Sequence, residues 1–275
     1  MQTYTLHTHT VGFDGRDSVQ AMVNSARDIG FKTIGISNHF IVNPIIKDTK
    51  MYPYSVSGGY SNIYSSSFDE AILRFEPHYH EILTLREQNL DMRILRGMEV
   101  DFFKDEKWLS GFEKAIQILK PDYIIGSAHF VEYNGTLLNV HDLKNADTKT
   151  QEKLLKIYWT NVANAAASGL FTWMAHLDLP KKVFLGQEDK WAEYESMAVE
   201  SIAKSKTAVE INTSGYKPYC DEPYPSIRIL KMIKQNNVPV LICDDAHETK
   251  NLGRHFDEAE TLIQQMKLKR FVKIK

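Results

Sequence analysis

Thr-Tyr-Thr-Leu-His-Thr-His, residues 3–9, is a short strand-like run that ends in two histidines. Side chains two apart in a strand point to the same face, so His7 and His9 offer two donor groups to one place. The same arrangement returns along the chain. Of the ten histidines, six end a predicted strand: His7, His9, His39, His129, His176 and His247.

Short apolar runs alternate with longer amphipathic ones. Predicted strands cover 3–7, 32–37, 92–98, 122–127, 171–175, 207–211 and 238–243. Predicted helices cover 17–29, 68–89, 106–119, 148–168, 188–205, 225–236 and 256–267. A strand followed by a helix, seven times over, predicts a parallel α/β fold. Polar residues follow strands throughout the chain, which favours a barrel over an open sheet, because an open sheet concentrates its site at one switch point.

The chain is expected to form one domain over residues 1–275, since α/β barrels of about 200–250 residues commonly fold as one unit. Pro77 lies inside 68–89 and predicts a kink or a division into two helices. Residues 40–67 are rich in Tyr, Ser, Gly and Asn and show no period. Because they follow His39, we interpret them as a substrate-covering loop at the mouth of the barrel, with a disordered segment as the alternative.

Composition excludes several partner classes. The net charge is −2, and no basic, aromatic-interleaved stripe is present, which argues against nucleic acid and against a membrane surface. Cys220 and Cys243 form neither a disulfide framework nor a paired zinc spacing. The start has no signal-peptide pattern, and no apolar run reaches about 18 residues. We therefore expect a cytoplasmic protein with a small-molecule partner; its oligomeric state is not readable from the sequence.

Three carboxylates, Asp14, Glu99 and Asp245, stand at the same depth as the six histidines. A single histidine at a strand end is more often a hydrogen-bonded structural residue, but the repeated placement favours metal binding. Imidazole and carboxylate suit Zn, Mn or Fe, and no thiolate joins them. A catalytic zinc takes three protein ligands, so nine groups predict two or three divalent ions, with Glu99 as the bridging carboxylate. A core of this size needs no structural metal, so the ions are expected to be catalytic.

Six motifs, in this order, resemble the PHP (polymerase and histidinol phosphatase) family: His7-Thr8-His9, Ser37-Asn38-His39, Gly97-Met98-Glu99-Val100-Asp101, Ser127-Ala128-His129, Ala175-His176-Leu177-Asp178 and Asp245-Ala246-His247. The resemblance runs from residue 3 to about residue 260. Residues 97–102, 176–182, 212–215 and 223–226 look like the histidinol-phosphate phosphatase branch. The resemblance to the PHP family implies a distorted (β/α)7 barrel, similar to a TIM barrel, with a three-metal site at the carboxyl ends of the strands.

The resemblance also implies how the ligands are shared. It assigns His7, His9, Glu99 and Asp245 to one ion, Glu99, His129 and His176 to a second, and Asp14, His39 and His247 to a third. Asp14 stands where many family members have a histidine, which is expected to favour Mn or Fe over Zn. Asp244 is a second departure, and it could compete as a ligand or support one. The residues expected to act in catalysis are Glu99, Asp245 and His247.

The implied function is hydrolysis of a small phosphate monoester, with L-histidinol phosphate of histidine biosynthesis as the expected substrate. The expected mechanism is in-line attack by a metal-bridging hydroxide, without a phospho-enzyme. Candidate phosphate-binding residues are Lys181, Lys182, Lys217 and Arg254; Lys217 and one of Lys181 or Lys182 are preferred, and solvated surface residues are the alternative. Lys217 stands where the family shows an arginine, so a bidentate fork is lost.

Asp178 is expected either to orient His176 or to cap a helix. The amine and imidazole of histidinol are expected to meet acidic or aromatic groups of one loop, unless these are loop filler: Tyr216, Tyr219, Asp221, Glu222 and Tyr224. One alternative function is a phosphoesterase on the same metals that acts on another monoester or a nucleic-acid end. A non-catalytic metal-binding module is a remote alternative, because all nine donor positions are filled.

Overall fold

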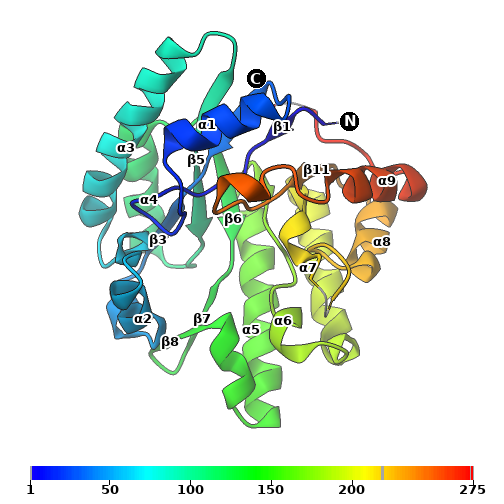
Figure 1. The fold of residues 1–275 in the computed structure, drawn as a ribbon. Helices are drawn as coiled ribbons and strands as arrows, with labels where there is room; N and C mark the ends of the chain where they lie inside the picture. Colours follow the sequence, from blue (N-terminus) through cyan, green and yellow to red (C-terminus); the bar gives the residue numbers. More distant parts are fainter. Residues whose placement is uncertain (1, 218–219, 273, 275) are drawn as a thin grey trace.

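The computed structural model describes residues 2–217, 220–272 and 274. Its sheet is a nearly closed parallel barrel, as predicted, and each of the seven predicted strands is present (Figure 1). The strands follow one another around the barrel in chain order: β1 (Tyr4–Thr5), β2 (Thr33–Ile36), β5 (Arg93–Asp101), β6 (Tyr123–Ser127), β9 (Trp173–Met174), β10 (Ala208–Asn212) and β11 (Val240–Cys243).

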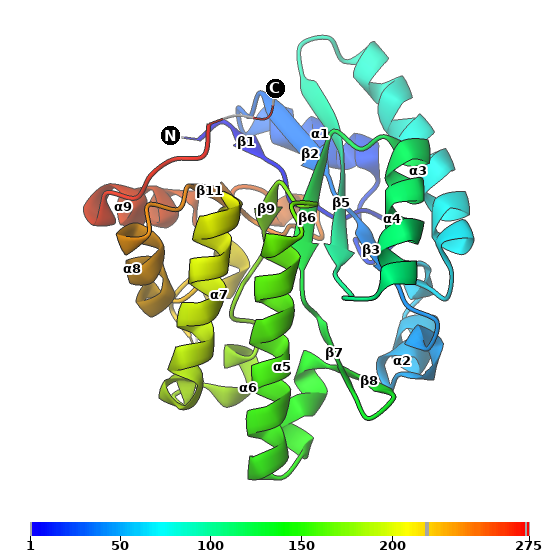
Figure 2. The same ribbon diagram turned by 180° about the vertical axis from the view of Figure 1, so that it is seen from behind.

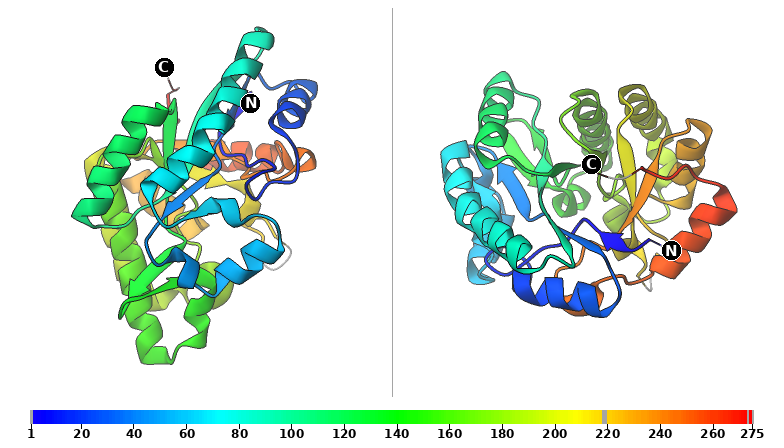
Figure 3. Two further views of the ribbon diagram at one scale, coloured as in Figure 1. Left: turned by 90° about the vertical axis from the view of Figure 1, so that its left-hand side faces the viewer. Right: turned by 90° about the horizontal axis from the view of Figure 1, so that it is seen from above.

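Helices surround the strands, as the view along the barrel in Figure 3 shows. They are α1 (Val19–Asp28), α3 (Phe68–Gln88), α4 (Glu106–Leu119), α5 (Thr148–Ala167), α7 (Ala192–Ser205), α8 (Ile227–Gln235) and α9 (Phe256–Met266). Four of them begin after a serine or aspartate whose side chain accepts a backbone N–H three residues on: Ser18, Ser67, Asp105 and Asp147. Helices α5 and α7 lie side by side in Figure 2. No helix within residues 2–217, 220–272 and 274 has the length and apolar run needed to cross a bilayer.

Pro77 lies inside α3, which continues as one helix, so a division into two helices is wrong. A proline removes one backbone donor and disfavours the preceding turn. Here the apolar face is buried on both sides of the proline, through Phe75 before it and Tyr79 and Ile82 after it. This packing holds the two halves together.

The inward-facing positions of the strands change from apolar to polar toward their carboxyl ends. Alternate residues of a strand share a face. Along β5 the inward series is Leu95, Gly97, Glu99 and Asp101, and along β10 it is Ala208, Glu210 and Asn212. The apolar end packs as a separate core inside the barrel, made of Leu6, Leu95, Tyr123, Ile125, Trp173, Ala175, Ala208, Leu241 and Cys243. The polar end is where the candidate site forms.

Tyr123 fills the barrel where two strands carry glycine. A Cβ atom at Gly35 would lie 2.0 Å from the Tyr123 hydroxyl, and one at Gly97 would lie 2.2 Å from the ring. The hydroxyl donates to Leu6 O at 2.6 Å, and the ring stacks on Trp173 with 5.0 Å between centroids. The two glycines are therefore required by the size of this side chain.

The barrel closes between β1 and β11 by one backbone bridge and by side chains. His9 N–H donates to Ala246 O at 2.9 Å, and Ala246 N–H donates to His7 O at 3.2 Å. Further from the mouth, the Gln2 amide bonds both the N–H and the carbonyl of Ile242. Thr5 donates its hydroxyl proton to Asp244 at 2.6 Å, and Gly253 N–H donates to the same carboxylate. Asp244 thus supports the seam instead of joining the donor set.

Several short elements were not predicted. They are β3 (His39–Val42), α2 (Met51–Ser57), β4 (Tyr64–Ser65), the antiparallel hairpin of β7 (Phe130–Tyr133) and β8 (Thr136–Asn139), and α6 (Lys181–Phe184). His39 begins a strand, although it was expected to end one. Residues 40–67, predicted to lack regular structure, contain α2 and β4. This segment and the hairpin lie at the same end of the molecule in Figures 1 and 2.

Candidate metal centre

The structure brings all nine predicted donor residues together at the carboxyl end of the barrel. Their ligand atoms form four overlapping groups, and the atoms within each group all lie within 4.8 Å of one another. Strand ends supply the residues from separate parts of the chain, which is the arrangement expected of an α/β barrel site. The groups are His9, Asp14, His39 and His247; His7, His176 and Asp245; His7, His9 and Glu99; and His39, Glu99 and His129.

Glu99 occupies the middle of the set and is 1% exposed. Its two carboxylate oxygens face five imidazoles, at 2.8 Å from His39 and His176, 3.3 Å from His7, and 3.6 Å from His9 and His129. Burial would raise the pKa of Glu99, but His39, His7 and His129 hold it well below its usual range. Glu99 is the position predicted for a bridging carboxylate.

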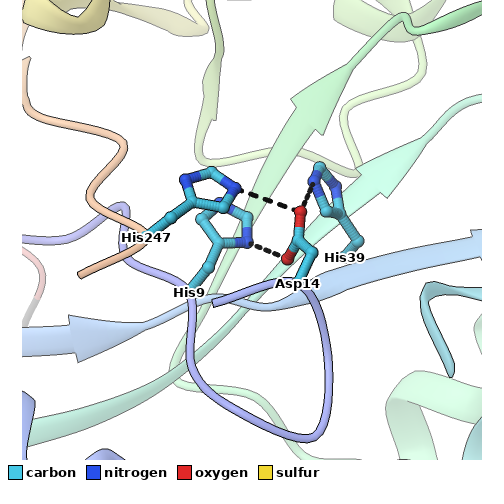
Figure 4. A group of neighbouring side chains, drawn as sticks. All are labelled: His9, Asp14, His39 and His247. Atoms are coloured by element: carbon cyan, nitrogen blue, oxygen red, sulfur yellow. Dashed lines mark hydrogen bonds and ion pairs between the residues drawn. The ribbon is translucent and has the colours of Figure 1, made fainter. Parts of the chain in front are cut away.

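Asp14 is the centre of a second cluster, shown in Figure 4. One oxygen lies 3.0 Å from His247 and 3.1 Å from His39, and the other lies 3.3 Å from His9. The resemblance assigned Asp14 to His39 and His247 alone. The geometry adds His9, which therefore lies between this cluster and Asp245, 3.3 Å away.

Buried polar atoms without a hydrogen bond provide a test of whether metal ions fit here. Buried side-chain nitrogen and oxygen atoms normally have partners, because an unpaired one costs free energy. Several atoms of the donor set have none despite their short separations: Nε2 of His7, both ring nitrogens of His9, Oδ1 of Asp14, Nδ1 of His39 and Oε2 of Glu99. Divalent cations would satisfy such atoms, so the residues fit a multi-metal centre.

The pKa values of the donor histidines are also consistent with a metal-binding site. Burial would lower the pKa of His7 and of His39, but the neighbouring carboxylates raise both well above the usual range. The protons that offset the buried negative charge therefore sit on imidazoles in the metal-free protein. A metal ligand must be deprotonated, so metal binding is expected to release these protons.

Two carboxylates behind the donors, Glu210 and Asp101, were not assigned a role from the sequence. Glu210 lies 2.9 Å from His7 Nδ1 and accepts hydrogen bonds from Trp173 Nε1 and Asn212 Nδ2. Asp101 lies 2.8 Å from His129 Nδ1. Such partners orient a ligating imidazole and fix its tautomer. The sequence does contain a sign of a role for Glu210, because it is a charged residue inside the otherwise apolar run 208–211.

Replacing Glu210 by glutamine is expected to weaken metal binding by about 10- to 100-fold, because loss of the partner of a ligating histidine typically costs that much. Competition with a chromogenic chelator measures the effect. The matched control is Glu195→Gln, since Glu195 is a buried carboxylate that pairs with Arg228 instead of a donor histidine. Equal metal affinity in Glu210→Gln and the wild type would contradict the assigned role.

Asp178 does not orient His176, contrary to one of the two roles expected for it. Its carboxylate accepts the Ser226 N–H at 2.8 Å and lies 3.6 Å from the Lys181 ammonium. Burial raises its pKa, although Lys181 opposes the change. Asp178 therefore joins the loop after β9 to the start of α8. The carboxylates that contact His176 are Glu99, at the ring, and Glu210, which accepts the backbone N–H at 3.3 Å.

His78, on α3, supports the centre from outside. Its ring accepts a hydrogen bond from Asn38 Nδ2 at 2.9 Å, and Asn38 also bonds Thr10, next to His9. Burial lowers the pKa of His78 to about 4. The folded protein therefore keeps this ring neutral at a pH where the unfolded chain protonates it.

Stability is consequently expected to fall between pH 6.5 and pH 4, by about 3 kcal/mol from His78 alone. The sign follows because the unfolded state binds the extra proton in this window. Urea unfolding of the metal-free wild type and of His78→Gln, at several pH values, measures it: the wild type should lose its advantage as the pH falls. His80→Gln, at an exposed position on the same helix, is the matched control. A constant difference for His78→Gln would contradict the account.

A cavity of about 240 Å³ opens beside the centre. Asp14, His39 and His129 of the donor set line it, together with Lys182 and His141. Residues 40–67 contribute Ile41, Met51, Tyr60, Ile63 and Tyr64 to its wall. Residues 40–67 therefore lie where a substrate-covering loop was predicted. That they cover a bound substrate stays a prediction.

The four predicted phosphate-binding residues have different surroundings. Lys182 lines the cavity, and its pKa is lowered by burial and, more weakly, by the nearby charge of the exposed Lys217. Lys181 is buried and donates to Pro223 O at 2.5 Å, beside Glu222 at 3.3 Å. Of this pair, only Lys182 is among the described residues that line the cavity.

Arg254 binds the backbone beside the site. Its guanidinium donates to Asp244 O at 2.7 Å and to Asp245 O at 3.4 Å. Asp245 has a φ of 50°, in the left-handed region that few residues other than glycine adopt without cost. Arg254 therefore holds the turn that presents Asp245, and it positions the donor instead of facing the cavity.

The loop residues expected to recognise an amine or an imidazole make other contacts, away from the cavity. Glu222 bonds Lys181 and the Ile227 N–H, and Tyr224 is buried under Lys181. Tyr216 packs on His255 at 5.2 Å. Tyr219 lies outside the described residues. The described part of the cavity wall therefore contains none of these side chains.

Comparison with known proteins gives consistent matches. The family model described as the PHP domain matches residues 4–214. A probable histidinol-phosphatase of Deinococcus radiodurans is 32% identical over 178 residues, which span 64% of this chain and 65% of that protein. The histidinol-phosphatase of Saccharomyces cerevisiae is 21% identical, over 96% of this chain and 88% of its own length. The crystal structure of histidinol phosphate phosphatase from Lactococcus lactis, complexed with Zn, L-histidinol and phosphate, shares the fold, with a TM-score of 0.74, 19% identity, and coverage of 100% and 97%.

Proposed function

This chain belongs to the PHP domain family, and on that premise we propose that it is a metal-dependent phosphatase that hydrolyses L-histidinol phosphate to L-histidinol and phosphate. One observation carries the proposal: unpaired buried donor atoms of histidines and carboxylates converge beside a cavity that Lys182 lines. The names of the relatives support the choice of ester; the alignment with the Deinococcus radiodurans protein spans 65% of that protein.

The nine donors would hold two or three divalent ions, and their mixture of imidazole and carboxylate suits Zn, Mn or Fe. Such ions supply charge neutralisation for a phosphate dianion and acidify water at the site. The protein's own part is positional: Glu99 and Asp245 supply the negative charge between the ligand groups. His247, at the rim of the centre, is bound to Asp14. These three remain the residues proposed to act in catalysis.

Lys182 is proposed to bind the phosphate. Burial lowers the pKa of this amine, while the charges of Asp245 and Glu99 raise it, which places the ammonium within electrostatic reach of the donor set. A phosphate dianion in the cavity would meet this cation. The positive charge of the exposed Lys217 also lowers the pKa of Lys182, and a bound anion would offset this repulsion.

Replacing Lys182 by alanine is expected to raise KM for a phosphomonoester by about 10- to 100-fold, because a hydrogen bond to a charged group contributes about 1.5–3 kcal/mol. The effect should be smaller on kcat, since the contact is present in the ground state as well. Steady-state kinetics measure both constants. Lys190→Ala, at a position paired only with Gln187 in the described residues, is the control. An unchanged KM in Lys182→Ala would remove Lys182 from the site.

The substrate is tested by steady-state kinetics of the metal-loaded protein on a panel of phosphomonoesters. The proposal expects kcat/KM for L-histidinol phosphate to exceed that for every other ester of the panel, p-nitrophenyl phosphate included. A value no better than that for p-nitrophenyl phosphate would reject the substrate and leave a phosphatase of another ester. A covalently trapped phosphate on the protein would reject direct attack by water.

A further inference from the structure

His141 is a titratable residue at the cavity that lies outside the nine-donor set. It belongs to a short 3-10 helix, η3 (Val140–Asn145), and lines the cavity together with His39, His129 and Lys182. Its backbone N–H donates to the side chain of Asn139, but within the described residues its ring has neither a hydrogen bond nor an ion pair. The ring is therefore available to a ligand.

The β7–β8 hairpin, which follows β6, brings the chain back to the metal centre. It begins directly after His129, and the residue pair at its open end joins Phe130 to Asn139. Val140 N–H then donates to His129 O at 2.9 Å, and the Asn139 side chain accepts the His141 N–H at 3.0 Å. The backbone of His141 is thus anchored beside that of the donor His129, although His141 stands twelve positions further along the chain. Figure 2 shows the hairpin reaching from β6 toward α2.

Hydrolysis of an alkyl phosphate requires a proton at the leaving oxygen, because an alkoxide is a strongly basic leaving group. The donor-set side chains that line the cavity are committed to metal ions. Of the other titratable side chains in the wall, Tyr60 and Tyr64 carry phenols, which are weaker acids than an imidazolium. Burial raises the pKa of Tyr64 further, and Lys182 is needed as a cation. Imidazole is the side chain whose ordinary pKa lies nearest neutrality.

We propose that His141 is the general acid that protonates the leaving alcohol, an inference that rests on the proposed function. As the P–O bond breaks, its electron pair passes to the leaving oxygen, which takes the proton of the His141 imidazolium. Phosphorus gains the oxygen of a water molecule, whose released proton goes to solvent. The neutral imidazole regains a proton from solvent, so the cycle needs no other reactant.

The charges around His141 fit this role. Burial lowers its pKa, and the positive charges of Lys182, Lys144 and His129 lower it further, while Asp142 opposes them. A lower pKa makes the imidazolium a stronger acid. A bound phosphate dianion offsets the charge of Lys182, so the ring is expected to hold its proton when substrate is present.

The test compares leaving groups in metal-loaded His141→Ala and wild-type protein. The substrates are L-histidinol phosphate, n-butyl phosphate, whose alcohol is also a poor leaving group, and p-nitrophenyl phosphate, whose phenolate leaves without a proton. General acid catalysis contributes about 10²- to 10⁴-fold, so kcat should fall by about that factor on both alkyl esters and far less on the aryl ester. Exogenous imidazole should restore part of the lost activity. Metal content and thermal unfolding should match the wild type, and His80→Ala should behave as the wild type throughout.

Each other outcome overturns the inference. An equal fall on all three esters would indicate a structural role, and a fall on L-histidinol phosphate alone would indicate that His141 binds the imidazole of the substrate. Absence of hydrolysis by the wild type on every ester would reject the proposed function itself. The failure of the inference and the failure of the function are therefore distinguishable.

Discussion

Replacing Glu99 by glutamine is expected to lower kcat/KM for any phosphomonoester by at least about 10³-fold, more than the loss of a single preorganised donor. Glu99 faces five imidazoles, and each of its two oxygens lies 2.8 Å from a ring nitrogen. A glutamine presents an amide N–H₂ where one of these oxygens stands, and it removes the negative charge that Glu99 would supply to bound metal ions. The loss should therefore appear as lost metal as well as lost turnover.

Metal analysis after gel filtration and steady-state kinetics measure the two effects. Glu260→Gln is a suitable control, because Glu260 is a buried carboxylate far from the centre, bonded to Gln2 N–H and Arg270. Circular dichroism establishes that each variant is folded. A folded Glu99→Gln protein with the wild-type metal content and turnover would refute the role of Glu99.

Truncating Tyr123 to alanine is expected to destabilise the protein by about 3–5 kcal/mol, the usual cost of removing a buried aromatic ring. The ring fills the space above Gly35 and Gly97, stacks on Trp173 and bonds Leu6 O. No neighbouring side chain can replace it, because the facing strands carry glycine. Urea unfolding of the metal-free protein measures the change.

A double-mutant cycle with Gly97→Ala makes this prediction specific. In the wild type, the added methyl group would lie 2.2 Å from the Tyr123 ring, and such overpacking costs about 1–3 kcal/mol. In the Tyr123→Ala background the same methyl group enters the vacated space and should be neutral or stabilising. Additive free energies would show that the two residues do not compete for one space.

The long regular elements were predictable from the sequence because their signals are local. Strands with apolar side chains and helices with caps and a buried face need no knowledge of distant residues. The missed strands β3, β4, β7 and β8 are two to four residues long. Their pairing depends on which segments the barrel brings side by side, and no pattern within so few residues indicates it.

The candidate site, too, was predictable from the sequence only in part. Most of the nine donors were predicted because they stand at or near the end of a strand, a position visible in the sequence, and the family motifs supplied the assignment of Asp14. Glu210 was missed, since its role depends on which side of β10 faces the barrel. Lys181 and Lys182 are adjacent in a four-residue helix, α6, and only their surroundings in three dimensions separate a buried cation from one at the cavity.

The central claim is that this centre binds divalent metal ions and that phosphate-ester hydrolysis depends on them. Its most direct test is the phosphatase activity of chelator-stripped protein titrated with Mn or Zn. The account predicts no activity without metal and a rise that saturates at two or three equivalents per chain. Full activity in the stripped protein, or none on any phosphomonoester after metal has bound, would contradict it.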